Sequence, residues 1–338
     1  MSVLITGTAG FIGFHTAKRF LEEGHKVVGY DGFTDYYDLT LKHKRVEILE
    51  SYENFTSVVG MLENAHLLTE TVETHKPEIV VHLAAQAGVR YSIENPSAYI
   101  SSNVQGTFNL LEALRHNVPK HLLLASTSSV YGGNTVFPFE ETARVGFPVS
   151  LYAATKSAGE AISHSYAGLF DIPTTCFRFF TVYGPWGRPD MALFKFVDRM
   201  LRGEEIEVYG NGAMSRDFTY IDDIVEGIVQ LSRTVPVVGT GDSEVGELDS
   251  ISPVAPWRVV NIAGGQPVPL MSFITAIENA LGVEAKKTML PMQAGDVTDT
   301  LASPELLEAL TGFIPNTPLE EGISNFVDWY QEYHDDRN

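Results

Sequence analysis

Residues 2–6 (SVLIT) run directly into residues 7–13 (GTAGFIG), and this stretch decides the fold. A short apolar run leads into a glycine-rich turn, and a helical pattern follows as far as Gly24, a residue type that often ends helices. Residues 26–30 (KVVGY) then read as a second strand, which ends in Asp31. The order strand, glycine-rich turn, helix, strand and acid predicts a dinucleotide-binding unit.

Each part of this unit has a predicted task. Gly7 allows the tight turn, Gly10 lets a pyrophosphate approach the backbone, and Gly13 lets the helix pack on the sheet. The N-terminus of the helix offers N–H groups and a positive dipole end to the phosphates. Asp31 is placed to accept hydrogen bonds from an adenosine ribose and to repel a 2′-phosphate, which favours NAD over NADP. The alternative is a glycine-rich turn that holds no ligand, but the flanking strand, helix and acid argue against it.

A second pattern concerns Tyr152 and Lys156, four residues apart in a stretch that reads as helix. This spacing puts a phenol and an ammonium group on one helical face. A free phenol has a pKa of about 10, so it is a poor base at neutral pH unless a nearby cation favours its ionised form. A tyrosine tuned in this way can remove a proton from a sugar hydroxyl. By itself the pattern also fits an ordinary aromatic residue and a solvated lysine on a helix.

The third feature is the apolar strand 121–125 (HLLLA), which runs into the hydroxyl-rich segment 126–132 (STSSVYG). Groups at the carboxyl end of a parallel strand face the crevice where ligands bind in open α/β sheets. A polar turn without function is the simple interpretation. With Tyr152 and Lys156 downstream, Thr127 becomes a candidate hydrogen-bonding group for the reacting oxygen.

Length and composition limit the classes of protein that the chain can represent. It has 338 residues, enough for one large or two modest domains, and a net charge of −20, which disfavours binding to nucleic acid or an anionic membrane. The lone cysteine, Cys176, is expected to be a packed thiol without a disulfide. The sequence shows no long apolar run, no leader pattern and no metal-binding histidine spacing, so we expect a cytoplasmic protein without a metal.

The order of elements predicts an α/β fold, with a Rossmann-like doubly wound parallel sheet and a smaller mixed α/β C-terminal substrate domain. We place the NAD-binding domain at 1–181 and the mainly substrate-binding domain at 182–338, with some segments interleaved. The segment 234–256 is expected to be a surface loop. Further strands are expected at 55–59, 78–83 and 173–177, and helices at 39–50, 67–75, 96–116, 191–203, 221–232, 270–281, 304–310 and 319–333.

The residue sets TGTAGFIG (6–13), STSSVYG (126–132) and YAATK (152–156) together resemble the extended short-chain dehydrogenase/reductases that act on nucleotide sugars. The resemblance covers nearly the whole chain. Five further segments resemble the UDP-glucuronate 4-epimerases in particular, and these are 31–38, 82–96 (HLAAQAGVRYSIENP), 178–192 (RFFTVYGPWGRPDMA), 216–227 (RDFTYIDDIVEG) and 293–300.

The resemblance implies a mechanism in which NAD takes up and returns the hydride at carbon 4 of a UDP-sugar. Tyr152 removes the 4-hydroxyl proton, Lys156 holds the nicotinamide ribose and lowers the pKa of Tyr152, and Thr127 binds the 4-oxygen. It also implies a homodimer built on the helices that start near residues 98 and 151. The implied cofactor-binding residues are Gly7, Gly10, Phe11, Ile12, Gly13, Asp31, Leu62, Tyr152 and Lys156. The implied substrate-binding residues are Arg90, Thr127, Ser128, Ser129, Thr181, Arg188, Arg216 and Asp296.

Two hydroxyl positions separate this chain from related enzymes that share the first step. By resemblance, a related decarboxylase has Glu at the position of Ser129, and related 4,6-dehydratases have Asp-Glu at Ser128 and Ser129. Elimination needs an acid and a base, which serines do not supply, so epimerisation is favoured. Arg188 is the candidate partner for a glucuronate carboxylate. A simpler role for Arg188 is that of a loop arginine paired with Asp190.

Several implied roles have a competing interpretation. Arg216, the implied diphosphate ligand, and Asp296, the implied uridine-ribose contact, could instead be members of surface ion pairs. Met61 stands where the family usually has an Asp that binds adenine. The loss of this one hydrogen bond should weaken NAD binding by about 1 kcal/mol. Leu62 could still contact adenine through its backbone.

The overall activity also has more than one interpretation. The chain could be an epimerase for UDP-glucose or another UDP-hexose. An NAD-binding regulatory protein without activity is a third hypothesis, against which Tyr152 and Lys156 argue, because a binding module has no need of a tuned phenol.

Overall fold

The computed structural model describes residues 1–239, 245–293 and 295–335. Of the loop predicted at 234–256, residues 240–244 lie outside the described residues, and the described remainder includes a short helix, η4 (Gly246–Leu248). Within the described ranges, we find no helix with the length and apolarity needed to span a membrane.

The centre of the described chain is a seven-stranded sheet in the order β10-β6-β5-β4-β1-β2-β3, in which every neighbouring pair is parallel. The strand order reverses beside β1, and such a reversal opens a crevice at the carboxyl ends of the strands. The doubly wound parallel sheet predicted from the sequence is therefore confirmed. Its strands are β1 (Ser2–Thr6), β2 (Lys26–Asp31), β3 (Phe55–Val59), β4 (Ile79–His82), β5 (His121–Thr127), β6 (Thr174–Phe179) and β10 (Trp257–Ile262).

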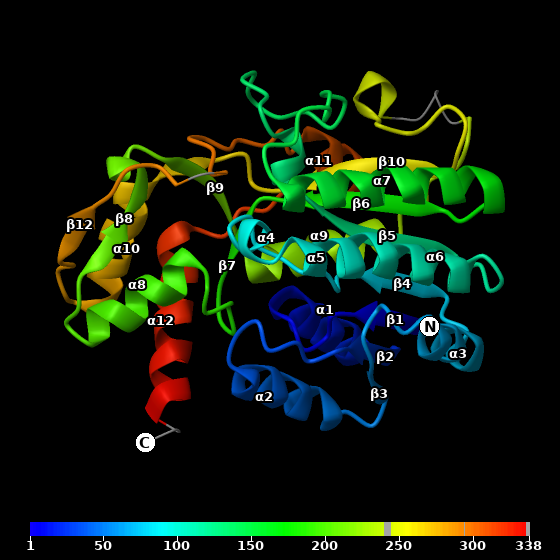
Figure 1. Cartoon of the computed structure of the whole chain (residues 1–338), viewed down its shortest axis with the longest axis horizontal. Coiled ribbons are helices and arrows are strands. Elements are labelled where there is room, and N and C mark those ends of the chain that lie inside the picture. The colour runs from blue at the N-terminus through cyan, green and yellow to red at the C-terminus, as the bar shows by residue number, and fades with distance from the viewer. Residues whose placement is uncertain (240–244, 294, 336–338) are drawn as a thin grey trace.

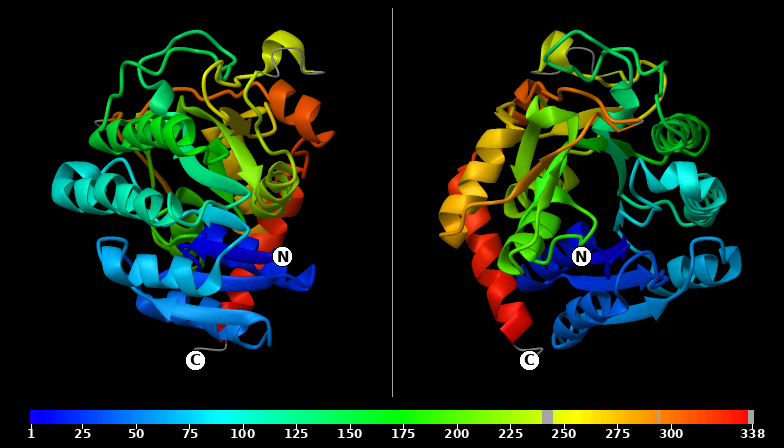
Figure 2. Two further views of the ribbon diagram at one scale, coloured as in Figure 1. Left: turned by 90° about the vertical axis from the view of Figure 1, so that its right-hand side faces the viewer. Right: turned by 60° about the vertical axis from the view of Figure 1, so that its left-hand side comes forward.

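Helices cover both faces of this sheet (Figure 2). Alternate residues of a strand point to opposite faces, so Val3 and Ile5 belong to one hydrophobic cluster and Leu4 belongs to another. The first cluster includes residues of α1 (Phe11–Glu22) and α9 (Ile221–Ser232), which also contact each other. The second includes residues of α3 (Ala65–His75) and α6 (Thr107–Leu114), and α7 (Leu151–Phe170) packs beside α6.

A smaller unit lies beyond the carboxyl ends of the central strands, on the left in Figure 1. It has one sheet in the order β11-β9-β7 and another that pairs β12 with β8. Its strands are β7 (Thr181–Tyr183), β8 (Ile206–Val208), β9 (Ser215–Tyr220), β11 (Pro267–Pro269) and β12 (Lys287–Met289), and its helices include α8 (Ala192–Leu201), α10 (Leu270–Leu281) and α12 (Leu319–Asp335).

Two elements of the second half, α9 and β10, pack on or within the central sheet, as interleaved segments would. The helix predicted at 96–116 is divided into α5 (Pro96–Tyr99), the π-helix η1 (Ile100–Gly106) and α6. The three-residue strands of the smaller unit were not predicted, because such short segments carry no clear periodicity. The remaining elements are α2 (Leu39–Glu50), α4 (Tyr91–Glu94), η2 (Ser128–Tyr131), η3 (Tyr209–Gly212) and α11 (Glu305–Thr311).

Candidate functional site

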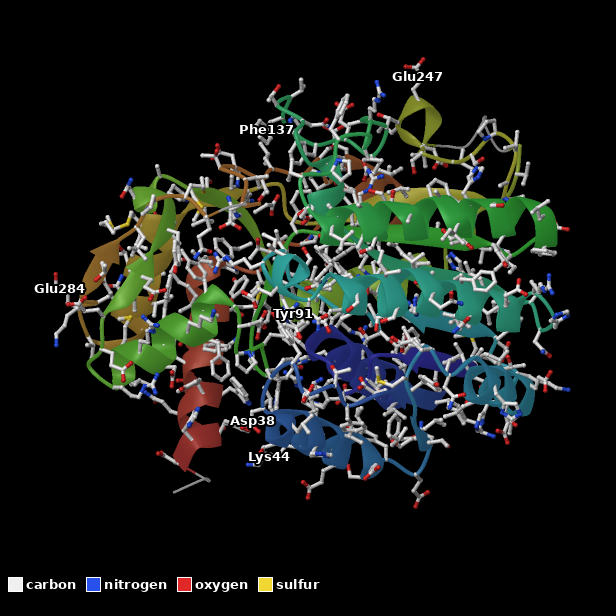
Figure 3. All side chains as sticks on the ribbon, in the orientation of Figure 1. Asp38, Lys44, Tyr91, Phe137, Glu247 and Glu284 are labelled. Atoms are coloured by element: carbon white, nitrogen blue, oxygen red, sulfur yellow. The ribbon has the colours of Figure 1, made fainter. Side chains whose placement is uncertain are left out.

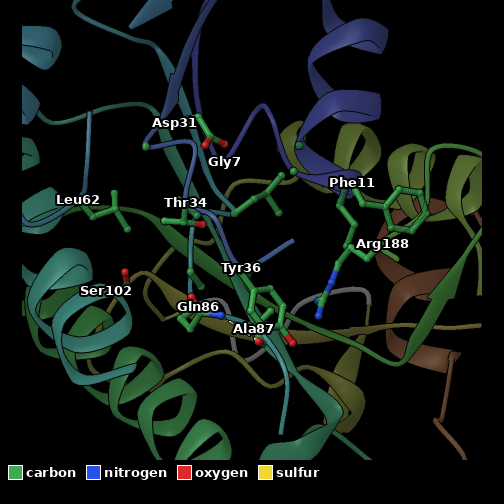
Figure 4. Close-up of a pocket in the computed structure, with 18 of the residues that line it drawn as sticks. Gly7, Phe11, Asp31, Thr34, Tyr36, Leu62, Gln86, Ala87, Ser102 and Arg188 are labelled. Atoms are coloured by element: carbon green, nitrogen blue, oxygen red, sulfur yellow. Dashed lines mark hydrogen bonds between the residues drawn. The ribbon is translucent and has the colours of Figure 1, made fainter. Parts of the chain in front are cut away.

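A cavity of about 260 Å³ lies where the central strands end (Figure 4). Its walls come from the turn after β1, the end of β2, the segment after β4, the ends of β5 and β6, and α7. Parallel strands end at one edge of a sheet, so the fold gathers segments that are far apart in sequence. The predicted residues that line this cavity are Gly7, Gly10, Phe11, Ile12, Gly13, Asp31, Leu62, Thr127, Tyr152, Lys156 and Arg188.

The glycine-rich turn has the geometry that a dinucleotide site requires. Gly7 has φ +83°, and a Cβ added there would lie 2.8 Å from the backbone N of Ala84. A Cβ added to Gly13 would lie 2.0 Å from the carbonyl oxygen of Gly7, so only glycine fits. Helix α1 starts at Phe11, and Gly10 provides no side-chain cap. The first N–H groups of the helix therefore face the cavity without a side-chain cap, as phosphate binding needs.

Asp31 is held in place by two backbone groups at the end of β2. Its carboxylate accepts hydrogen bonds from the N–H of Ala9 and the N–H of Phe33, both at 2.9 Å. Lys42 also lines the cavity and donates to Thr34. Burial lowers the pKa of Lys42, and Asp31 partly opposes that shift. The cavity wall therefore carries a fixed carboxylate beside a partly desolvated ammonium group.

The segment after β3 forms another part of the wall. Leu62 and Ser102 lie together on one side of the close-up in Figure 4. The carbonyl of Met61 accepts from the Tyr30 hydroxyl at 2.9 Å, and the carbonyl of Leu62 accepts from the Asn109 amide at 2.9 Å. Both carbonyls are thus already engaged within the protein. The Ser102 hydroxyl donates to Glu63 at 3.1 Å and is a polar group on this wall that the sequence did not indicate.

Tyr152 and Lys156 lie one turn apart on α7 and both line the cavity. Burial raises the pKa of Tyr152, while the Thr127 hydroxyl and the Arg188 cation lower it in part. Burial lowers the pKa of Lys156 to about 8, and its ammonium group donates to the carbonyl of Ala125 at 3.0 Å. In the protein alone, burial raises the pKa of Tyr152 more than Thr127 and Arg188 lower it, and the effect of Lys156 on this pKa with the cofactor bound stays a prediction.

Glu160, a further turn along α7, supports this part of the site. Its carboxylate forms a buried bidentate ion pair with Arg178 of β6, with N–O distances of 2.9 and 2.8 Å. Ser126, which lines the cavity, donates to the same carboxylate. Glu160 also opposes the fall in the pKa of Lys156. The ion pair therefore anchors α7 to β5 and β6 directly behind the candidate catalytic residues.

Arg188 reaches the cavity from the loop between β7 and α8. Its guanidinium group binds Asp190, with Nε donating at 3.0 Å and Nη2 donating to the second oxygen. Burial lowers the pKa of Arg188, but Asp190 and the neighbouring Tyr36 and Tyr37 raise it more, so the group stays charged. The pairing with Asp190, which was the simpler role for Arg188, is therefore present, and it occupies two donor groups of the arginine.

Tyr36 completes this arrangement from the loop after β2. Its hydroxyl donates to Asp190 at 3.1 Å, and Figure 4 shows its ring beside Arg188. The Tyr36 ring packs on Tyr91, with 4.7 Å between centroids, and Tyr91 lies near the middle of the molecule (Figure 3). Two aromatic rings from the segments after β2 and β4 therefore lie beside Arg188.

The remaining hydroxyl candidates have separate positions. Thr181 lines a smaller cavity of about 30 Å³, and Arg188 lines both cavities. Thr127 accepts a hydrogen bond from the N–H of Ser129 at 3.2 Å and donates to the hydroxyl of Ser129 at 3.3 Å. Ser128 and Ser129 are not among the described residues that line either cavity.

Arg90, Arg216 and Asp296 form a cluster outside the walls of the two cavities. Arg90 pairs with Asp296 at 3.2 Å, and Arg216 donates to the carbonyls of Val297 and Thr298. Asp296 raises the pKa of Arg216, while burial lowers it overall. The structure thus brings these three predicted residues together, and it shows the ion pair that was the competing interpretation of Asp296.

Sequence reasoning missed several polar groups of the main cavity. Thr34 and Tyr36 lie in a loop that the sequence marked only through its resemblance, and Gln86 lies in the segment after β4. The backbone of Gln86 is bound on both sides by Asn103 of η1, through its N–H at 2.8 Å and its carbonyl at 3.0 Å. Polar residues that directly follow a predicted strand were the available signal for Gln86. The π-helix that presents Asn103 and Ser102 left no recognisable pattern.

The sheet, the glycine cradle and the tyrosine–lysine pair together define a dinucleotide-binding α/β protein with an ionisable site for small-molecule chemistry. The chain matches the model of the NAD dependent epimerase/dehydratase family over residues 3–243. It belongs to this family.

Similar proteins and structures agree with that assignment. A probable UDP-glucuronate 4-epimerase of Rhizobium meliloti is 57% identical over 332 residues, which cover 98% of this chain and 97% of the relative. The crystal structure of UDP-glucuronic acid 4-epimerase from Bacillus cereus, in complex with UDP-glucuronic acid and NAD, is 31% identical with a TM-score of 0.86 and covers 98% of this chain and 100% of that one. A UDP-glucose 4-epimerase from Thermotoga maritima with UDP-glucose is 28% identical, with a TM-score of 0.84 and coverage of 99% and 100%.

Proposed function

We propose that this protein is an NAD-dependent epimerase that interconverts UDP-glucuronate and UDP-galacturonate at carbon 4. The observation that carries the proposal is that, among the described residues, no carboxylate lines the end of the main cavity that holds Tyr152, since Asp190 and Glu160 are paired with Arg188 and Arg178 and do not line it. Among the described residues that line the main cavity, Asp31 is the one carboxylate, and it lies at the end of β2 with the nucleotide turn. Elimination of water requires a positioned acid and base, and the reacting end of this cavity carries hydroxyls, a phenol, an ammonium group and a guanidinium group.

The glycine cradle, the uncapped start of α1 and the carboxylate of Asp31 fit the pyrophosphate and adenosine ribose of NAD. NAD, when bound, supplies reversible hydride transfer, so the net redox change of an epimerisation is zero. Gly7, Gly10, Phe11, Ile12 and Gly13 would hold the phosphates. Asp31 would hold the ribose, and Leu62 and Ser102 would border the adenine.

Tyr152 would remove the proton of the sugar's 4-hydroxyl and return it to the product. Burial favours the neutral phenol, so the phenolate must be stabilised by Thr127, by Arg188 and by positive charge that arrives with the ligands. Lys156 is held toward the cavity by Ala125 and would bind the nicotinamide ribose. Its pKa of about 8 leaves it largely protonated at neutral pH.

Substrate choice depends on Arg188. A uronate carboxylate could bind the donors that Asp190 leaves free, or replace Asp190, with Thr181 in the adjoining cavity and Ser128 and Ser129 after Thr127. The same ion pair supports a second candidate function, the epimerisation of a neutral UDP-hexose such as UDP-glucose. Asp190 already compensates the charge of Arg188, so a neutral sugar would leave no cation unpaired.

Arg90, Arg216 and Asp296 would bind the UDP part of the substrate. Arg90 directly precedes α4, Arg216 belongs to β9 and Asp296 lies between β12 and α11, and their mutual contacts hold them in one cluster. In this proposal, residues 1–181 bind mainly NAD and residues 182–338 mainly bind the UDP-sugar, with α9 and β10 returning to the first domain.

Incubation of the purified protein with UDP-glucuronate and with UDP-glucose separately, followed by chromatography of the sugars, tests the two candidates. We expect turnover of UDP-glucuronate, and turnover of UDP-glucose alone would select the second candidate. Arg188→Ala should reduce kcat/KM for UDP-glucuronate at least tenfold more than for any neutral sugar. The matched control is Arg202→Ala, which removes an exposed arginine that is also paired with an aspartate. Equal losses on both sugars would make Arg188 a structural residue.

We further propose a homodimer in which the helices of residues 96–114 and α7 face their counterparts. These helices lie side by side in Figure 1, and they expose Ile100, Phe108 and Leu169. Light scattering at working concentration should give twice the mass of one chain, and a monomer would refute the proposal. A cytoplasmic location is part of the same proposal, and cell fractionation tests it.

A further inference from the structure

Arg45 of α2 is a fully buried cation that the proposed chemistry does not use. Its Nη1 donates to the carbonyl of Ala9 and to the hydroxyl of Tyr37, both at 2.8 Å. Its Nη2 donates to the carbonyl of Trp186 and, at 3.3 Å, to that of Gly187. One guanidinium group therefore joins the glycine-rich turn, the loop after β2 and the loop that carries Arg188.

The chemistry of this contact set is unusual for a buried arginine. In the described part of the chain, its hydrogen-bond partners are three carbonyls and a phenol, and none is a carboxylate. Burial lowers its pKa, while Tyr37 and Asp31 raise it in part. Burying a charge without an ion-pair partner costs several kcal/mol. A neutral, well-packed side chain would avoid this cost. The charged guanidinium group of Arg45 therefore indicates a role beyond packing.

The segment that Arg45 holds on its far side is strained. Trp186 has φ +60°, a conformation that is rarely adopted by bulky residues. Its ring packs against the rings of Phe14 and Trp329, with centroid distances of 5.5 and 5.3 Å. His15 of α1 donates to the carbonyl of Pro185 at 2.9 Å. The three carbonyls directly before Arg188 are thus all held by side chains of the first domain.

The near side of Arg45 is the nucleotide turn itself. The peptide groups of Ala9 are bound at both ends, since its N–H donates to Asp31 and its carbonyl accepts from Arg45. Asp31 faces the predicted adenosine ribose, and Ala9 lies between Gly7 and Gly10 of the phosphate turn. Any displacement of the turn by a bound dinucleotide would therefore be transmitted to the loop of residues 185–188 through one rigid group.

We infer that Arg45 is a positioning residue that sets the place of Arg188 relative to the bound cofactor. This inference rests on the proposed function for the role of Arg188 at the reacting end of the cavity. The planar fork of Arg45 has the geometry for several acceptors at once, which an ammonium group lacks. The effect on the substrate is indirect, because Arg45 lines neither described cavity.

A double-mutant cycle between Arg45 and Arg188 tests the inference. We expect Arg45→Met to lower kcat/KM at least tenfold in the natural protein and less than threefold in Arg188→Ala. Arg45→Lys should keep part of the activity and covers the case in which Arg45→Met does not fold. Arg258→Met is the matched control, because Arg258 on β10 is likewise buried and lines neither described cavity, while its ion-pair partner is Asp249 and not the loop of residues 185–188.

The pH profile separates positioning from a merely structural role. Arg188 lowers the pKa of Tyr152, so Arg45→Lys and Arg45→Met should move the acid limb of kcat/KM to higher pH, in the same direction as Arg188→Ala. Losses that multiply independently in the cycle, or an unmoved acid limb with only a lower melting temperature, would overturn the inference. The cycle is measured with whichever UDP-sugar the natural protein turns over. Failure to turn over UDP-glucuronate would therefore refute only the proposed function.

Discussion

Thr127→Val is the most direct test of how the protein ionises Tyr152. The substitution is close to isosteric and removes one hydroxyl. In the natural protein this hydroxyl lowers the pKa of Tyr152, whereas burial raises it, so the variant should have a higher pKa at Tyr152. A hydrogen bond to a charged group contributes about 1.5–3 kcal/mol. Since about 1.36 kcal/mol corresponds to a tenfold change in rate, turnover at pH 7 should fall about 10- to 150-fold.

The dependence of this loss on pH identifies its cause. As pH rises, more of the Tyr152 population ionises without help, so the difference between the variant and the natural protein should shrink. The assay is the initial rate of UDP-galacturonate formation, resolved by chromatography, across the stable pH range. Thr71→Val, which removes a buried hydroxyl of α3 that donates to Leu67, controls for lost stability. Ser129→Ala controls for the contact that the Thr127 hydroxyl makes to the Ser129 hydroxyl, and it keeps the backbone N–H of residue 129 that donates to Thr127. A loss that is constant with pH, or no loss at all, would refute the assigned role of Thr127.

Two other predictions follow from the same residues and from the buried network beside them. Tyr152→Phe should reduce turnover at least 100-fold and leave the melting temperature within a few degrees, because one oxygen is lost; unchanged turnover would exclude Tyr152 as the base. Glu141 accepts from the N–H of Asn261 at 2.8 Å, and burial raises its pKa to about 7. The folded state therefore binds its proton more tightly than the unfolded state, and stability falls as pH rises from about 4.5 to 7. Glu141→Gln should remove this dependence and gain about 3 kcal/mol at pH 8, as scanning calorimetry would measure, whereas a pH curve parallel to that of the natural protein would contradict the assignment.

The comparison between Tyr152 and Arg188 shows where sequence reasoning succeeds. Tyr152 and Lys156 are one helical turn apart, so their relation is set by local geometry and follows directly from their spacing. The surroundings of Arg188 include Asp190, two residues along the chain, and also Tyr36, which donates to Asp190 from 154 residues away in the sequence. No local pattern reports such a contact, so the sequence could not decide between the carboxylate and ion-pair roles of Arg188.

The electrostatic balance at Tyr152 was also beyond local reasoning. Spacing placed Lys156 on the same helical face as the phenol, but it did not show that the ammonium group donates to the carbonyl of Ala125 or that burial lowers the pKa of Lys156. Depth of burial is a property of the packed molecule. Residue types therefore could not show that burial raises the pKa of Tyr152 by more than Thr127 and Arg188 lower it.

The glycine-rich turn, the alternating strands and helices, and the pair on α7 were determined by sequence alone, because each depends on residues within a few turns of one another. The parallel sheet followed from their order. Only the tertiary structure decided which cations face the phenol, how Asp190 occupies Arg188, and that Arg45 connects the nucleotide turn to the loop before Arg188. Those relations join distant segments, and their strength depends on the exclusion of water, which arises when the whole chain has packed.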